Sequence, residues 1–125
     1  MSIRDALNTR LAEVLAGISW PVLWEGVSAP QPSGDIWVEA QLLQGAPAWL
    51  FSGQSSWMTG FLVVNVVSMT GIRDVSPIVA GFPQGAVYRA GGQRVTIANR
   101  AEERPPFRDG AQWRQPIFIA YEAGV

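Results

Sequence analysis

The stretch FLVVNVV at residues 61–67 decides the fold, because it is apolar at every position except Asn65. It lies within a longer β-type segment that runs from Trp57 to Met69. A strand that is apolar on both faces is typical of a central strand that is covered on both sides. We therefore expect this segment to be the central strand of a sheet, with the Asn65 side chain hydrogen-bonded if it is buried.

Further strands are predicted on both sides of this segment. Residues 35–43 alternate, with Ile36, Val38, Ala40 and Leu42 on one face and Trp37, Glu39, Gln41 and Leu43 on the other. A turn at 44–47 leads to a return strand that starts at 48–51, and a loop follows at 53–56. Residues 94–100 indicate a strand with an arginine-bearing face, and residues 112–122 a last strand. The proline-rich stretches 28–34 and 101–110 are expected to be loops or a frayed edge.

Two helices are expected. Apolar residues recur at three- and four-residue spacing from residue 2 to residue 16, which predicts an amphipathic helix with a Ser2/Asp5 capping box and a stop at Gly17. A short second helix is expected within 71–82, with Pro77 in its first turn and Asp74 or Ser76 as its N-cap. The fold class is therefore α+β. We expect an antiparallel or mixed sheet of about four to six strands, with both helices packed on it, in a single domain of residues 1–125.

The composition excludes several classes of function. The net charge is −1, and all nine basic residues are arginines spread from Arg4 to Arg114, so the basic patch of a nucleic-acid-binding protein is missing. Because the chain has no cysteine and no histidine, the usual catalytic triads and thiol nucleophiles cannot form. No carboxylate cluster has the spacing of a metal site, so we expect no catalytic residues, no metal and no cofactor. No apolar run is long enough for a membrane span, and residues 1–5 do not read as a signal peptide, which makes the cytoplasm the default location.

The six tryptophans allow two interpretations. They could form an aromatic platform for sugars or bases, or they could fill the core and subunit contacts, where Trp and Arg are enriched. A charged fraction of 15%, against a typical value of about 25%, favours burial against partners. The candidate interface residues are Trp37, Glu39 and Gln41 on the outer side of their strand, together with Trp49 and Trp57.

The order of elements resembles the tail terminator, or tail completion, proteins of long-tailed bacteriophages and prophages. The resemblance covers nearly the full chain. It rests on the N-terminal helix and on the segments WPVLWEG (20–26), DIWV (35–38), TGFLVV (59–64), GFP (81–83) and IFIAY (117–121). Two departures are Pro77 inside the expected second helix and the loop that contains Arg104, Pro105 and Pro106. They affect the span of that helix and of the last hairpin.

The resemblance implies a structural role in the virion tail. Proteins of that family form a ring, generally of six subunits, that caps the tail tube, stops tube polymerisation and offers the surface for head docking. The implied partners are other copies of the chain, the tube protein and the head–neck connector protein, with assembly in the host bacterial cytoplasm. DNA would pass through the lumen without specific binding. The alternatives are another neck or minor tail protein, a carbohydrate- or peptide-binding module that uses exposed tryptophans, and a carboxylate enzyme.

The central strand provides a first test. Val64→Asp would place an unpaired charge in the core and is expected to lower the free energy of unfolding by about 3 kcal/mol or more. Thermal unfolding followed by circular dichroism measures the change. A melting temperature within about 2 °C of the wild-type value would show that this strand is not central.

Overall fold

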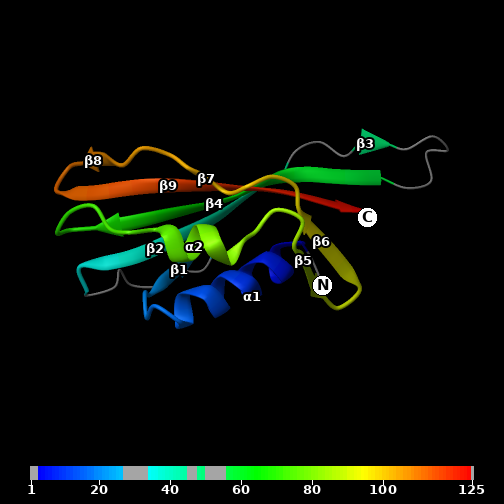
Figure 1. Cartoon of the computed structure of the whole chain (residues 1–125), viewed down its shortest axis with the longest axis horizontal. Helices are drawn as coiled ribbons and strands as arrows, with labels where there is room; N and C mark the ends of the chain where they lie inside the picture. Colours follow the sequence, from blue (N-terminus) through cyan, green and yellow to red (C-terminus); the bar gives the residue numbers. More distant parts are fainter. Residues whose placement is uncertain (1–2, 27–33, 45–47, 50–55, 125) are drawn as a thin grey trace.

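The computed structural model describes residues 3–26, 34–44, 48–49 and 56–124, with the backbone alone at 48, 49, 56 and 57. The described residues form one nine-stranded mixed sheet and two helices (Figure 1). The elements in chain order are α1 (Ile3–Ala16), β1 (Val22–Trp24), β2 (Ile36–Gln44), β3 (Ala48–Trp49), β4 (Ser56–Ser68), α2 (Ser76–Gly81), β5 (Val87–Ala90), β6 (Gln93–Ile97), β7 (Glu102–Glu103), β8 (Phe107–Asp109) and β9 (Gln112–Gly124).

The centre of the sheet is the long antiparallel pair β4–β9. The strand order is β1-β2-β4-β9-β6-β5, with β3 beside β4, and with β7 and β8 beside β9. The pairing of β4 with β9 runs without a break from Trp57 opposite Gly124 to Ser68 opposite Trp113. Strand β1 is parallel to β2, whereas the other pairs are antiparallel. Residues 61–67 therefore lie in a central strand, as the sequence predicted.

Pro116 lies in the middle of β9 without interrupting this pair. The backbone N–H and C=O of one residue point to the same side of an antiparallel strand. The carbonyl of Pro116 accepts a hydrogen bond from the Arg104 N–H at 3.0 Å, so the missing donor of Pro116 also faces the β7–β8 side. There Pro105 and Pro106 separate β7 from β8. The gap in hydrogen bonding thus falls on an edge that is already interrupted.

Both helices pack on one face of the sheet, which we call the inner face (Figure 1). The apolar stripe predicted for this helix comprises Ile3, Leu7, Leu11, Val14, Leu15 and Ile18. Helix α1 buries Ile3, Leu7, Leu11 and Leu15 against the even-numbered residues of β2 and β4 and the odd-numbered residues of β9, whereas Val14 and Ile18 are partly buried at the border of this core. Helix α2 contributes Ile78, and Val75 and Phe82 flank it in the same cluster. The N-terminal helix and its buried face are confirmed.

Helix α2 lies so close to α1 that the carbonyl of its last residue, Gly81, is held by two side chains. Arg10 Nε and Tyr88 Oη each donate a hydrogen bond to this carbonyl at 2.9 Å. A Cβ atom on Gly81 would lie 2.4 Å from a methyl group of Val14 in α1. The short second helix was predicted, with Pro77 in its first turn, and it comprises the six residues Ser76–Gly81. Its N-cap is Val75, so the predicted Asp74 or Ser76 cap is wrong. Asp74 instead accepts a hydrogen bond from the Ser76 N–H.

In the described part of the chain the sheet has nine strands, more than the four to six that were predicted, because the prediction missed four short ones: β1, β5, β7 and β8. Strand β5 forms a hairpin with β6 around Gly91 and Gly92, and it was not predicted at all. Strands β7 and β8 occupy the stretch that was expected to be a loop or a frayed edge. Both pair along β9. Short edge strands lack the long apolar periodicity on which the prediction rested.

The structure also corrects the expectation that helices or loops cover β4 on both sides. In the described part no helix lies on the second face of the sheet, which we call the outer face. Val63 and Val67 are nevertheless buried there, at 6% and 0% exposure, although neither belongs to the helix-packed core cluster. The capping box at Ser2, the proline-rich stretch 28–33 and the turns at 45–47 and 53–55 lie outside the described residues.

Gly60 provides a test of the β2–β4–β9 packing. A Cβ atom at this position would lie 2.2 Å from the Leu43 carbonyl oxygen and 2.7 Å from the Tyr121 hydroxyl. Because the first of these is a backbone atom, we expect Gly60→Ala to lower the free energy of unfolding by about 1–3 kcal/mol. Denaturant unfolding measures the loss. The matched control is Gly92→Ala, where a Cβ meets nothing within 4 Å. Equal stability of the two variants would contradict the packing described here.

Candidate functional site

The outer face of the sheet is the candidate site, because it carries the predicted interface row of β2 and no described helix covers it. Trp37, Glu39, Gln41 and Leu43 point to this face, and their exposure increases along the strand. Trp37 is 2% exposed, Glu39 is half-buried, and Gln41 and Leu43 are exposed. The structure thus places three predicted interface residues on one face, with Gln41 the exposed one. The side chains of Trp49 and Trp57 lie outside the described residues.

A hydrogen-bonded network holds Trp37, which is the buried end of this row of outward-facing β2 residues. The Trp37 indole N–H donates to Glu39 Oε2 at 3.1 Å, and Arg114 Nη1 donates to Glu39 Oε1 at 2.8 Å. Arg114 also contacts Asp109, with Nε 3.2 Å from Oδ2. The register places Val67 between Trp37 and Arg114 on adjacent strands, which explains why Val67 is buried without a helix above it. Trp37 therefore serves mainly as a packing residue of the outer face.

The network keeps Glu39 ionised. Partial burial raises the pKa of Glu39, but the hydrogen bonds from Arg114 and Trp37 outweigh this effect, and the pKa lies below its ordinary value. The same pair raises the pKa of Arg114, chiefly through the hydrogen bond to Glu39. Both groups are charged at neutral pH. Each charge is therefore compensated within the chain.

The other end of the outer face is apolar. Leu43 and Phe61, which are opposite each other in the β2–β4 register, are 42% and 41% exposed. Phe118 of β9 packs edge-on against Phe61, with ring centroids 5.6 Å apart, and the Arg104 guanidinium lies 4.3 Å from the Phe118 ring centroid. We call Leu43, Phe61 and Phe118 the apolar patch. Exposed apolar side chains that lie close together on a sheet face are a candidate contact surface. The sequence prediction missed this patch. The run at 61–67 is apolar on both faces of its strand, and this already indicated that apolar side chains would lie on the outer face.

A hollow of about 290 Å³ adjoins the same face at the β1 edge. Its lining includes Leu23, Glu25, Glu39, Gln41 and Asn65. Glu25 binds Arg4 and accepts a hydrogen bond from the Leu42 N–H. These contacts, with the Arg4 hydrogen bond the largest, hold its pKa below the ordinary value. Asn65 was expected to be hydrogen-bonded if buried. It is half-buried and its side chain borders this hollow instead.

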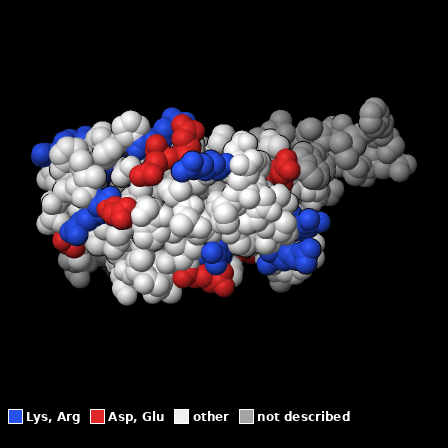
Figure 2. Space-filling view, in the orientation of Figure 1, with Lys and Arg blue, Asp and Glu red and all other residues white. Residues whose placement is uncertain are grey.

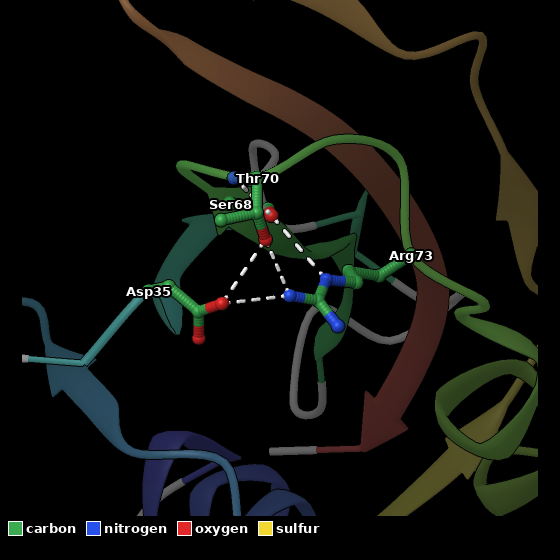
Figure 3. Close-up of polar contacts among 4 residues, drawn as sticks. All are labelled: Asp35, Ser68, Thr70 and Arg73. Atoms are coloured by element: carbon green, nitrogen blue, oxygen red, sulfur yellow. Dashed lines mark hydrogen bonds and ion pairs between the residues drawn. The ribbon is translucent and has the colours of Figure 1, made fainter.

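A polar cluster links the start of β2 to the end of β4, where Ile36 and Ser68 are paired (Figure 3). Arg73 Nη2 contacts Asp35 Oδ2 at 2.8 Å, and the Thr70 hydroxyl lies between the two, donating to Asp35 Oδ2 at 3.0 Å. Arg73 Nε also donates to the buried Ser68 hydroxyl at 3.4 Å. All four side chains have partners within the cluster. Its role is to fix the connection between β4 and α2.

The four tryptophans whose side chains are described do not come together as a platform. Of the four tryptophans whose side chains are described, Trp20 and Trp24 pack against the helix-covered core, and Trp37 is buried on the outer face. Trp113 is half-buried, with the Arg108 guanidinium 5.5 Å from its ring centroid. None of these four side chains is exposed. The described part therefore offers no flat aromatic surface for a sugar or a base.

The surface charges are dispersed. Figure 2 shows small groups of both signs, separated by wide uncharged areas. Within the described residues, no group of three or more acids could hold a metal ion. Neither of the two described helices is long and apolar enough to cross a membrane. The described residues form a small α+β protein with an apolar patch on the outer face of its sheet and charges of both signs in small groups.

A family model described as phage tail terminator protein matches residues 2–121, so the chain belongs to the phage tail terminator family. This match confirms the resemblance found in the sequence and establishes a structural role in the phage tail. No curated protein matches the chain. A solved structure of 24% sequence identity superimposes with a TM-score of 0.79 and covers 97% of this chain and 92% of that chain. At this identity the likeness shows the fold alone.

The Glu39 network gives a testable pH dependence. In Glu39→Gln the Arg114 contact loses its charge, and we expect a loss of about 1 kcal/mol at pH 7, a value that allows for solvent screening of a partly exposed pair. Because the folded-state pKa of Glu39 is lowered, its contribution is present above the unfolded-state pKa and is lost as the pH falls through the folded-state pKa. The stability difference between wild type and variant should therefore shrink as the pH falls below the ordinary carboxyl pKa of 4.5.

Urea unfolding of both proteins between about pH 3 and pH 7 measures this difference. The matched control is Glu102→Gln, which removes the exposed pair with Arg104 and should change the stability by less than about 0.5 kcal/mol. A Glu39→Gln loss that stays constant across the pH range would show that Glu39 is not the group that titrates.

Proposed function

We propose that this chain is the subunit of a ring that caps the phage tail tube. Addition of the ring stops tube polymerisation and creates the surface onto which the filled head docks. Its partners are further copies of the chain, the tube protein and the head–neck connector protein, and assembly takes place in the host bacterial cytoplasm. DNA passes through the lumen without specific binding. The observation that carries the proposal is the family match over residues 2–121.

The outer face supports this role. A capping subunit must present surfaces to several partners, whereas a monomeric protein rarely exposes neighbouring large apolar side chains. The apolar patch and the exposed Gln41 lie on one sheet face, next to the buried Trp37 and its Glu39 partner. We propose this face as the contact face for tail partners, with Trp49 and Trp57 at its β3–β4 end. The role is structural, without catalytic residues and without a cofactor.

The near-neutral charge fits a lumen that does not grip DNA. Binding of duplex DNA depends on several arginine or lysine contacts with phosphates. Five of the nine arginines in this chain are held in ion pairs with its own acids: Arg4, Arg10, Arg73, Arg104 and Arg114. Such arginines are compensated before any phosphate approaches. A passage for DNA, rather than a binding site for it, is the role this distribution supports.

Tail capping can be tested directly on purified, uncapped tails. We expect wild-type protein to form a cap at one end of each tube and to arrest further growth when tube protein is added. Negative-stain electron microscopy and the distribution of tube lengths measure the two effects. Folded wild-type protein that leaves the tube ends bare and tube growth unchanged would refute the capping function.

The contact face is tested with Leu43→Glu, which places a charge on the apolar patch. We expect it to lose capping while its melting temperature stays close to wild type, because Leu43 is already 42% exposed. The matched control is Ile72→Glu, at an apolar residue that is 60% exposed and lies outside the patch. If wild type caps and Leu43→Glu caps equally well, the assignment of the contact face is wrong and the function stands.

A further inference from the structure

The outer surface of the β5–β6 hairpin carries two arginines that make no ion pair among the residues that the structure describes. Arg89 and Arg94 are directly opposite each other in the hairpin register, and both are exposed. Like charges at directly opposite positions of an antiparallel pair repel each other. Although all ten acids of the chain lie in the described part, none makes an ion pair with either arginine. Figure 2 shows basic side chains in the region of this hairpin. The pair is therefore a site that an external anion would stabilise.

The hollow at the β1 edge has the complementary chemistry. Glu25 and Glu39 both line it, together with the amide side chains of Gln41 and Asn65. A carboxylate has about four lone-pair sites, and the hydrogen bonds that Glu25 and Glu39 receive within the chain leave acceptor capacity free. A guanidinium offers five donors in a plane, which suits such a set of oxygen acceptors. The hollow can therefore accept an arginine side chain.

The hairpin and the hollow lie at opposite edges of the sheet, because β1 and β5 are the two ends of the strand order. A closed ring requires a contact in which one surface of each subunit meets a different surface of the next. A surface with two arginines and a hollow with free oxygen acceptors, at the two edges of one sheet, meet this requirement. Resting on the proposed ring function, we propose that Arg89 and Arg94 of one copy bind in the hollow lined by Glu25, Glu39, Gln41 and Asn65 of the next copy.

A second copy fits the arginine pair better than a nucleic acid does. Two arginines supply few of the phosphate contacts that hold a protein on duplex DNA. Val87, which is 37% exposed, and Thr96 share the hairpin face with them, and Glu122 of β9 lies opposite Thr96. A surface that mixes apolar, hydroxyl and acidic groups with two arginines is typical of a protein–protein contact.

The absence of cysteine from the chain makes cross-linking a clean test. Gln41→Cys places a thiol at the hollow, and Val87→Cys places one on the hairpin face. On tail ends, or at high protein concentration, a short thiol–thiol cross-linker should join copies in a mixture of the two single variants. It should not do so within either variant alone. A doubly substituted chain should give a ladder of linked copies that ends at the closed ring.

Two controls make the result specific. Ala12→Cys, at an exposed position of α1, replaces Gln41→Cys and should give about tenfold less cross-linked product. Adding Arg89→Glu and Arg94→Glu to the Val87→Cys chain should reduce cross-linking to Gln41→Cys by a similar factor. A partner that carries Asn65→Arg beside Gln41→Cys should restore part of it, because the new guanidinium can pair with the introduced carboxylates. Arg100→Glu, at an exposed arginine outside the pair, should have no effect.

The outcomes separate this contact from the function on which it rests. Caps on tail ends without cross-linking above the Ala12→Cys level would overturn the contact and leave the capping function standing. Cross-linking that survives Arg89→Glu and Arg94→Glu would also overturn it. If these two substitutions instead abolish salt-sensitive binding of duplex DNA while cross-linking stays at the control level, the pair is a phosphate site. Wild-type protein that never caps a tail would remove both proposals.

Discussion

The continuous antiparallel pairing of β4 with β9 is the constraint on which the rest of the structure depends. It fixes which residues of both strands face the helices and which face outward, because a shift by one residue would exchange the two sets. Val64 and Ile117, opposite each other, are directed into the core, and Val63 and Phe118 to the outer face. The short strands β6, β7 and β8 then find their places along the free side of β9. The same pairing register therefore determines both which residues form the core and which residues form the contact face.

Much of this architecture follows from local sequence patterns. The apolar run at 61–67, the alternation at 35–43 and the helical spacing at 2–16 each depend on a period that persists for several residues. Strand β6 was predicted, but its hairpin partner β5 was missed because it is only four residues long and none of its residues is fully buried. A signal was nevertheless present, since Gly91-Gly92 is a two-residue hairpin turn between segments that alternate. Short edge strands are recognised by their turns rather than by their own composition.

The candidate site was only partly predictable, for a physical reason. The alternation at 35–43 placed Trp37, Glu39 and Gln41 on the outer face, but burial along that face depends on which side chains the neighbouring strands bring beside them. Trp37 is buried because the register sets Val67 and Arg114 next to it, 30 and 77 residues away in the sequence. The apolar patch arises in the same way from β2, β4 and β9. Pairing over such separations cannot be read from a single local pattern.

The way in which the sheet edges end has a consequence for aggregation. An unpaired strand edge is a template on which further chains can add by backbone hydrogen bonds. Here β1 and β5 are three and four residues long, and the free side of β9 is filled by β6, β7 and β8 around Pro105 and Pro106. Pro116 removes one more donor from that side. Because its sheet edges are short or interrupted by proline, the chain resists edge-to-edge aggregation through backbone hydrogen bonds at high concentration. Any ordered self-association then depends on side-chain recognition, which can be made geometrically selective.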